Sequence, residues 1–147
     1  MGTRYTYPVR LEPQQDGSIL VRFPDLPEAL TDGADEAEAL VEASDCLSET
    51  LAGRIHRGED LPPPSPARRG MRDVAPDPTI ALKAALYDAL RKHGMALPDL
   101  ARRLGIDERQ AARLIDPCAR SRLTSLEETL SVLGYTIGIE LRKKRIA

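Results

Sequence analysis

The chain has 147 residues, of which 41% are hydrophobic and 30% are charged, with no Trp and one Phe. This composition is typical of a soluble globular protein and excludes a disordered chain, and no apolar run approaches the roughly 20 residues that a membrane-spanning helix needs. The net charge of −2 hides an asymmetry, because residues 1–75 have eight Lys/Arg against fourteen Asp/Glu, whereas residues 76–147 have thirteen against nine. We therefore expect two domains, 1–75 and 76–147, with partners of different charge.

The first part of the chain predicts a small β-sheet. Residues 5–12 alternate between apolar and polar side chains, and residues 18–23 do so again after a QQDG sequence. Because Asp-Gly suits a tight turn, the two segments predict a hairpin. The segment 24–27 (PDLP) ends the second strand, since proline cannot donate to a β-ladder. A short third strand is expected at residues 29–31, before a turn at Asp32-Gly33.

A long amphipathic helix is predicted next. Asp35 is a candidate N-cap, and Glu36 and Glu38 suit the first turn of a helix. Apolar residues then recur at helical spacing as far as Ile55, and Gly58 marks the end of the pattern. This helix should cover one face of the sheet.

A proline-rich loop, residues 59–70, follows the helix. Its LPPPSP sequence is stiff and extended. A short fourth strand near residues 71–75 would return the chain to the edge of the sheet. After two prolines that break regular structure, we expect a helix over residues 80–93, capped by Thr79 and stopped by Gly94.

The segment 97–115, LPDLARRLGIDERQAARLI, has the pattern of two short helices joined by a tight turn. Ala101 is small enough to let the helices approach each other, Gly105 suits the turn, and Asp107 can cap the second helix. This pattern predicts a helix-turn-helix, whose second helix enters the DNA major groove. The alternative is an ordinary helical hairpin with a solvated charged face. The predicted DNA-binding side chains are Glu108, Arg109, Gln110 and Arg113, followed by Arg120, Ser121 and Arg122.

A further helix and a strand are expected after this motif. Ser125 and Glu128 have the spacing of a capping box, and Gly134 ends the helix that they begin. Residues 135–141 alternate between apolar and polar side chains, which predicts a terminal β-strand. A single strand needs an edge to pair with, so it either joins the same strand of a second copy or packs onto the N-terminal sheet.

The order of these predicted elements, together with several short sequence motifs, makes the chain resemble the HicB antitoxin family over nearly its whole length. One departure is Glu28, where the family usually has a glycine. The N-terminal half resembles the family in its alanine-rich helix and in three short segments: 21–27 (VRFPDLP), 31–33 (TDG) and 62–65 (PPPS). The C-terminal half resembles the longer family type at 80–83 (IALK), 100–105 (LARRLG), 113–117 (RLIDP), Ser121 and 126–134.

The resemblance implies an α+β fold. It implies a truncated ribonuclease-H-like domain, with a three- to four-stranded sheet and one helix, and a C-terminal helix-turn-helix domain with the terminal strand. The implied function is an antitoxin that neutralises a small HicA-type, mRNA-cleaving ribonuclease toxin and represses its own operon by binding operator DNA. An acidic N-terminal half fits a basic, RNA-binding partner. Toxin-binding residues would then lie in the loop 24–33 and the first helix, and the candidates are Asp25, Asp32, Asp35 and Glu36.

We expect no catalytic, metal or cofactor site. A ribonuclease-H-like nuclease needs several carboxylates on adjacent strands to hold paired metal ions, and the first two strands supply only Glu12 before Asp25. The histidines, His56 among them, have no motif around them and are expected at exposed helix ends. Cys46 and Cys118 have no metal-ligand spacing, and Cys46 is expected to be a small core residue.

Two alternatives remain open. One is a stand-alone helix-turn-helix transcriptional regulator whose N-terminal domain senses a small ligand. The other is a residual metal nuclease, which divalent-ion binding at Glu12 and Asp25 would support. Under the preferred hypothesis the chain forms a homodimer or tetramer, with residues 135–141 as a candidate contact. It would act in the cytoplasm of a bacterial or archaeal cell, at the nucleoid when bound to its operator.

Overall fold

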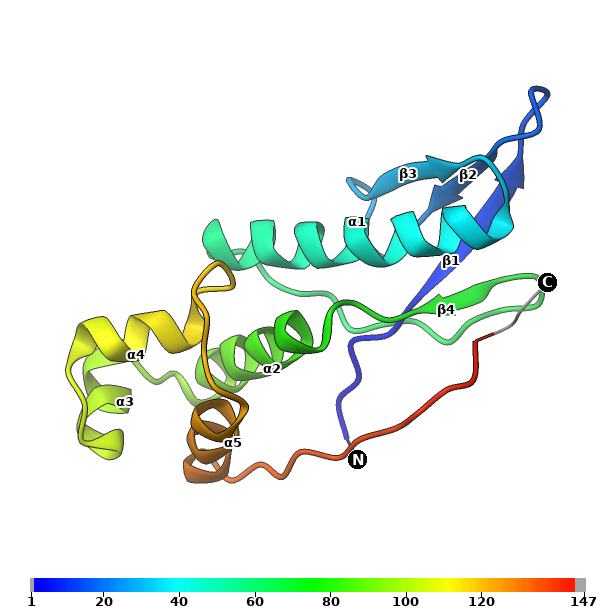
Figure 1. Ribbon diagram of the computed structural model, residues 1–147. Coiled ribbons are helices and arrows are strands. Elements are labelled where there is room, and N and C mark those ends of the chain that lie inside the picture. Colours follow the sequence, from blue (N-terminus) through cyan, green and yellow to red (C-terminus); the bar gives the residue numbers. More distant parts are fainter. Residues whose placement is uncertain (1, 145–147) are drawn as a thin grey trace.

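Four strands form one antiparallel sheet in the order β3-β2-β1-β4. The computed structural model describes residues 2–144, and Figure 1 shows the sheet at one end of the molecule and a group of short helices at the other. The strands are β1 (Tyr7–Pro13), β2 (Ile19–Arg22), β3 (Leu30–Gly33) and β4 (Arg72–Val74).

The predicted hairpin is confirmed, with each strand shorter or shifted by one or two residues. At its turn the Asp16 carboxylate accepts hydrogen bonds from the Ser18 backbone N–H (3.0 Å) and hydroxyl (2.6 Å). The prediction of a turn at Asp32-Gly33 is wrong, because both residues pair with β2 and extend β3. Gly33 also lies against the next helix, since a Cβ there would be 2.3 Å from the backbone nitrogen of Ala39.

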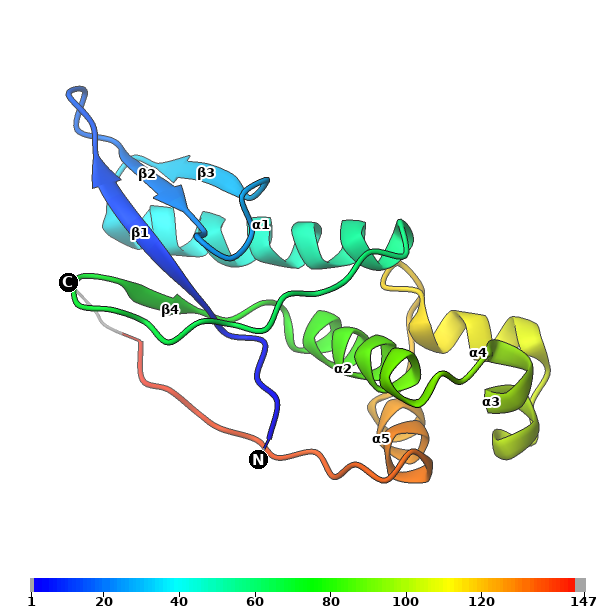
Figure 2. The same ribbon diagram turned by 180° about the vertical axis from the view of Figure 1, so that it is seen from behind.

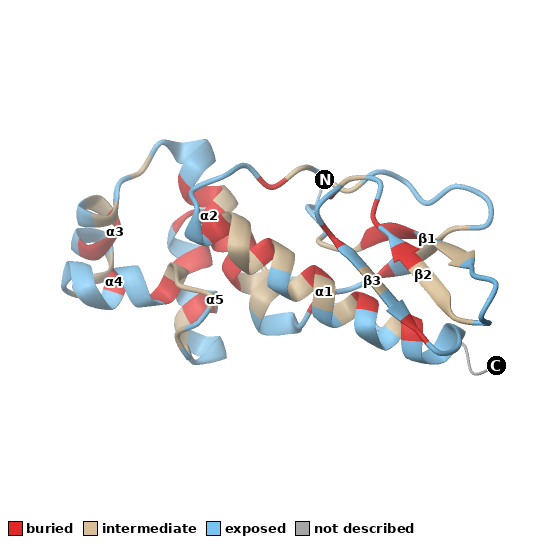
Figure 3. Cartoon of the chain, turned by 90° about the horizontal axis from the view of Figure 1, so that it is seen from above, coloured by how far each residue is buried: buried red, intermediate tan, exposed pale blue. Residues whose placement is uncertain are grey.

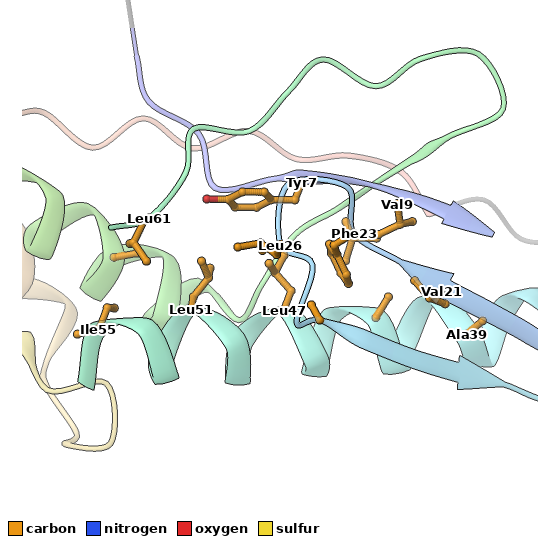
Figure 4. Close-up of a cluster of buried hydrophobic side chains, with 14 of the residues drawn as sticks. Tyr7, Val9, Val21, Phe23, Leu26, Ala39, Leu47, Leu51, Ile55 and Leu61 are labelled. Atoms are coloured by element: carbon orange, nitrogen blue, oxygen red, sulfur yellow. The ribbon is translucent and has the colours of Figure 1, made fainter. Parts of the chain in front are cut away.

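Helix α1 (Glu36–His56) packs across one face of the sheet, as predicted. Asp35 is its N-cap and accepts a hydrogen bond of 2.8 Å from the Glu38 N–H. Its buried residues are spaced four apart and therefore lie on one face of the helix. Figure 4 shows this face meeting Tyr7 and Val9 of β1, Val21 of β2 and Phe23, which follows β2. The buried residues of α1 are Ala39, Ala43, Leu47, Leu51 and Ile55.

The proline-rich segment is held against the sheet by hydrogen bonds. The Tyr7 hydroxyl donates to the Pro62 carbonyl at 2.6 Å, and the Ser65 hydroxyl donates to Asp25 at the same distance. The chain then enters β4, which pairs antiparallel with β1 and confirms the predicted fourth strand. In Figure 2 this segment is seen crossing the back of the molecule before it reaches β4.

Helix α2 (Pro78–His93) begins two residues earlier than predicted. Asp77, not Thr79, is the N-cap, and its carboxylate accepts a hydrogen bond of 2.8 Å from the Thr79 N–H. Pro78 does not break the helix, because the first helical position has no use for a backbone N–H. Gly94 ends α2 in the left-handed conformation (φ +60°), as predicted.

The C-terminal lobe consists of α2 with α3 (Leu97–Leu104), α4 (Glu108–Ile115) and α5 (Leu123–Val132). Leu86 and Leu90 of α2 pack into the core of this lobe, whereas Ala84 and Tyr87 pack into the core between α1 and the sheet. Figure 3 shows α2 between the sheet and the pair α3–α4. We call the sheet with α1 the N-terminal lobe; α2 contributes side chains to the cores of both lobes.

The structure contradicts two predictions for the end of the chain: the capping box at Ser125, and the pairing of residues 135–141 with the N-terminal sheet. Helix α5 begins at Leu123 without a side-chain cap, so Ser125 lies inside its first turn and forms no capping box. Residues 135–144 form no strand within the described chain. Apolar alternation does not supply backbone partners. Among residues 2–144 no backbone hydrogen bond joins this tail to β4, and the Arg142–Asp73 ion pair at 3.3 Å is a contact between side chains.

Candidate functional site

The turn between α3 and α4 has the geometry that the sequence predicts. Gly105 adopts the left-handed conformation (φ +67°), and the Ile106 N–H donates to the Ala101 carbonyl at 3.0 Å. Leu100, Ala101, Ala111 and Leu114 are buried between the helices. The small alanines allow the two helices to pack closely across this turn.

Helix α4 begins with a capping box. The Asp107 carboxylate accepts a hydrogen bond of 2.7 Å from the Gln110 N–H, and the Gln110 side-chain oxygen accepts one of 3.1 Å from the Asp107 N–H. The side chain of Gln110 is therefore partly engaged, because only its amide NH₂ group remains to meet a ligand. The first turn of α4 is held in place by both residues.

The outward face of α4 is polar and charged. Glu108, Arg109, Ala112 and Arg113 are all exposed. Within residues 2–144, none of the three charged side chains among them forms an ion pair. Their charges are thus available to an external partner.

A buried lysine, which the sequence analysis did not single out as functional, holds the end of α4. Lys83 of α2 is fully buried, and its Nζ donates to the backbone carbonyl of Arg113 (2.8 Å) and to the hydroxyl of Ser121 (2.6 Å). Burial lowers the pKa of Lys83. The sequence signal was a lysine inside an apolar helical stripe, which requires polar partners from elsewhere in the fold.

The predicted DNA-binding residues after α4 fall into two groups. The Ser121 hydroxyl is half-buried and holds the connecting loop against Lys83. Arg120 and Arg122 flank it and are exposed. The geometry therefore gives Ser121 a positioning role, while the two arginines remain accessible.

The four predicted toxin-binding acids do not form one patch of unengaged charge. The Asp25 carboxylate accepts from both the N–H (2.8 Å) and the hydroxyl of Ser65. Asp35 caps α1, and Glu36 forms an ion pair with Arg72. Asp32 is exposed on β3.

A more continuous acidic surface lies on α1. We call it the acidic face and define it as Glu38, Glu42, Asp45 and Glu49, which are exposed and spaced three or four residues apart. This spacing places them on one side of a helix. Within residues 2–144 no ion pair involves them. Of these four, only Glu38 was singled out from the sequence, as a residue suited to the first turn of the helix.

Glu28, the one departure noted above, has a local explanation. Its carboxylate forms a two-pronged ion pair with the Arg54 guanidinium at 2.7 and 2.9 Å, and this pairing lowers the pKa of Glu28. The turn forms without a glycine, since the Ala29 N–H donates to the Leu26 carbonyl at 2.9 Å.

Glu12 and Asp25, the carboxylates considered for a residual nuclease, each bind a different side chain and do not share a partner. Glu12 pairs with Arg22 across the hairpin at 2.9 Å, and Asp25 binds Ser65. A different group of potential metal ligands is present among residues 2–144: His56, Asp116 and Cys118. Sequence spacing did not reveal it, because His56 and Cys118 are 62 positions apart.

None of the helices within residues 2–144 has both the length and the apolar character needed to span a membrane.

Comparison with known proteins gives consistent matches. Residues 6–85 match a family model described as a HicB-like antitoxin of bacterial toxin–antitoxin systems. The chain is 30% identical over 135 residues to "Antitoxin HicB 1" of Photorhabdus laumondii, covering 92% of this chain and 86% of that protein. It is 29% identical over 133 residues to "Antitoxin HicB" of Escherichia coli K12, covering 90% and 96% respectively.

Proposed function

The chain belongs to the HicB-like antitoxin family of bacterial toxin–antitoxin systems, and on this basis we propose that its two lobes bind two different partners. The N-terminal lobe binds and neutralises a small HicA-type ribonuclease. The C-terminal lobe binds operator DNA and represses the operon that encodes both proteins. The protein itself is non-enzymatic and acts in the cytoplasm, at the nucleoid when bound to DNA.

The observation that best supports DNA binding is the start of α4. A capped helix follows a tight turn, and its outward face presents Arg109 and Arg113, which form no ion pair within residues 2–144. This is how a recognition helix is presented to the major groove. Arg109 lies in the first turn, where base contacts are made, and its guanidinium suits guanine. We assign phosphate contacts, which position the protein without reading sequence, to Arg113, Arg120 and Arg122.

The acidic face of α1 supports binding of a basic protein. Four exposed carboxylates on one side of a helix create a local negative field. A ribonuclease that binds RNA needs a positive surface, so this field would accelerate the encounter and oppose competing RNA. Asp32 is a separate exposed carboxylate: it pairs with Leu20 on β2, whereas its neighbour Gly33 lies against α1, so Asp32 is on the sheet face away from α1. We assign Asp25, Asp35 and Glu36 to the support of the acidic face, because each is engaged inside the chain.

Operator binding further implies two copies of the chain. Recognition helices normally bind paired half-sites about 34 Å apart, related by the two-fold axis of a dimer. The tail provides a candidate contact, because Ile139 and Leu141 are 84% and 92% exposed. Residues 135–141 would gain strand partners by pairing with the same segment of a second copy, giving a homodimer or a tetramer.

The experiment that tests the proposal separates the two activities in the full chain. A variant of α4, Arg109→Ala with Arg113→Ala, should lose operator binding in a band-shift assay and still rescue growth when the neighbouring toxin gene is expressed. A variant of the acidic face, Glu42→Gln with Asp45→Asn, should weaken toxin binding and leave operator binding unchanged. Loss of both activities in both variants, with the fold intact, would contradict the division between lobes.

A further inference from the structure

His56, Asp116 and Cys118 meet where the two lobes touch. The Nε2 of His56, at the end of α1, lies 3.3 Å from the Cys118 Sγ and 3.7 Å from the Asp116 Oδ1. The three ligand atoms all lie within 4.8 Å of one another. Figures 1 and 2 both show the loop between α4 and α5 beside this end of α1.

These separations are close to those within a tetrahedral zinc site. Zinc binds cysteine sulfur at about 2.3 Å and histidine nitrogen or carboxylate oxygen at about 2.0–2.2 Å, which places nitrogen and sulfur ligands roughly 3.6 Å apart and nitrogen and oxygen ligands roughly 3.4 Å apart. The corresponding distances here are 3.3 and 3.7 Å. These two pairs therefore need shifts of only a few tenths of an ångström to bind one cation, and the third pair, between Asp116 and Cys118, lies within 4.8 Å.

The ligands are also held by well-packed neighbours. His56 follows Ile55, which is buried in the N-terminal core, and Asp116 follows Ile115, which packs against the cores of both lobes. The Asp116 carboxylate accepts a hydrogen bond of 2.9 Å from the Cys118 N–H. Such a contact orients a ligating carboxylate in metal sites. The side chains of His56 and Asp116 are 48% and 43% exposed, so an ion can reach them from solvent.

We propose that His56, Asp116 and Cys118 bind a zinc-type divalent cation that joins the end of α1 to the loop after α4. A mixed nitrogen, oxygen and sulfur set is typical of zinc rather than of magnesium or calcium, which prefer oxygen alone. Three protein ligands leave a fourth position for water. The bound ion links the N-terminal lobe to the residues that follow the proposed recognition helix.

This site is separate from the surfaces assigned to the toxin and to DNA. None of its three ligands is among the side chains proposed for either surface. Failure of zinc binding would therefore leave the proposed function intact, and failure of toxin or operator binding would leave the metal site intact.

The test is titration of Zn²⁺ into the metal-free full chain by isothermal calorimetry. We expect one ion per chain, bound at least about tenfold more weakly after Cys118→Ser or His56→Ala, since even loss of an outer-shell partner costs that much. Asp116→Asn keeps the oxygen that accepts the Cys118 N–H, yet removes the charge, and should also weaken binding. Co²⁺ should give a thiolate charge-transfer absorption band that disappears in Cys118→Ser.

The chain contains matched controls for both soft ligands. Cys46 and His93 are the other cysteine and the other histidine of the chain, so Cys46→Ser and His93→Ala should bind Zn²⁺ like the unmodified chain. Zn²⁺ should also raise the melting temperature of the unmodified chain and of both controls, and raise that of Cys118→Ser less. Equal Zn²⁺ affinity in the unmodified chain and in Cys118→Ser would overturn the proposal, as would an equal loss in Cys46→Ser.

Discussion

The ammonium nitrogen of Lys83 lies 2.8 Å from the backbone carbonyl oxygen of Arg113, so a buried cation on α2 holds the last turn of α4. A helix end leaves carbonyl groups without partners inside the helix. Lys83 supplies a partner to one of them and to the Ser121 hydroxyl. The orientation of the outward α4 side chains therefore depends on a residue that never reaches the surface.

Lys83→Met should destabilise the protein. The substitution removes the donor and leaves the Arg113 carbonyl and the Ser121 hydroxyl without it, at a cost of about 1–3 kcal/mol. Urea unfolding measures the change, with Lys92→Met as the control, because Lys92 is an exposed lysine on the same helix. Equal unfolding midpoints for the two variants would show that the buried contacts contribute nothing.

Asp88→Asn should flatten the dependence of stability on pH in the acidic range. The Tyr5 hydroxyl donates to Asp88 at 2.7 Å, and burial raises the pKa of Asp88 above its ordinary value. The native state therefore holds this proton more tightly than the unfolded state does. Its contribution to stability is complete below the ordinary pKa of 3.8 and is lost as pH rises through the raised pKa. Asparagine retains an acceptor for Tyr5 and has no proton to lose.

Melting temperatures between about pH 4 and pH 7 check this prediction. The Asp88→Asn variant should be more stable than the unmodified chain at neutral pH, and the two should converge as the pH falls. Asp45→Asn, on the exposed side of α1, is the control. A curve for Asp88→Asn parallel to that of the unmodified chain would contradict the prediction.

Arg109→Ala should weaken operator binding and relax sequence preference. Loss of one guanidinium contact with a base edge costs about 1–3 kcal/mol. By contrast, alanine at Arg113, Arg120 or Arg122 should weaken specific and random duplexes alike and reduce the salt dependence of binding. Fluorescence anisotropy at several salt concentrations distinguishes the two kinds of contact. Arg10→Ala, on β1, is the control, and wild-type discrimination by Arg109→Ala would mean that another surface contacts the bases.

Gln110 should be tested by Gln110→Glu rather than by alanine alone. Glutamate at this position retains the oxygen that accepts the Asp107 N–H and so preserves the capping box. It loses the amide donor that would bind adenine. We expect Gln110→Glu to keep its melting temperature and lose operator affinity, whereas Gln110→Ala should lose both, with a stability cost of about 1 kcal/mol. Unchanged operator affinity in Gln110→Glu would mean that Gln110 only stabilises the start of α4 and does not contact DNA.

Glu42→Gln with Asp45→Asn should slow association with the toxin. Long-range attraction accelerates encounter more than it strengthens the final complex, so the association rate should fall roughly three- to tenfold at low ionic strength and much less at high salt. Stopped-flow mixing with an inactive toxin variant measures this rate. Glu127→Gln with Glu128→Gln makes the same charge change on α5 and is the matched control. An equal effect of both pairs would indicate net charge rather than the acidic face.

Elements with a complete local pattern could be predicted from the sequence. The four-residue spacing that ends at Ile55, the glycine at 105 and the cap at Asp107 each specify their own backbone, and the structure confirms them. The errors at Thr79 and Ser125 concern helix starts, where several residues compete for the same role. Asp77 with Pro78 outcompeted Thr79, and α5 began without any side-chain cap.

The rest depended on contacts between distant residues. The sequence around Lys83 does not predict that its hydrogen-bond partners are Arg113 and Ser121. The cluster of His56 with Cys118 likewise forms only when the end of α1 meets the loop after α4. The alternation at residues 135–141 is real, but a strand also needs a neighbour, and no sequence pattern supplies one.

Helix α2 contributes Ala84 and Tyr87 to one core and Leu86 and Leu90 to the other. The two lobes therefore cannot be separated without breaking up one of these cores. If a protease removed either lobe, the remaining lobe would have either a cavity in its core or apolar side chains of α2 exposed to water. Unfolding should thus be a single cooperative event, and under the proposed function a cell that degrades this protein would release the ribonuclease and reopen the promoter in the same step.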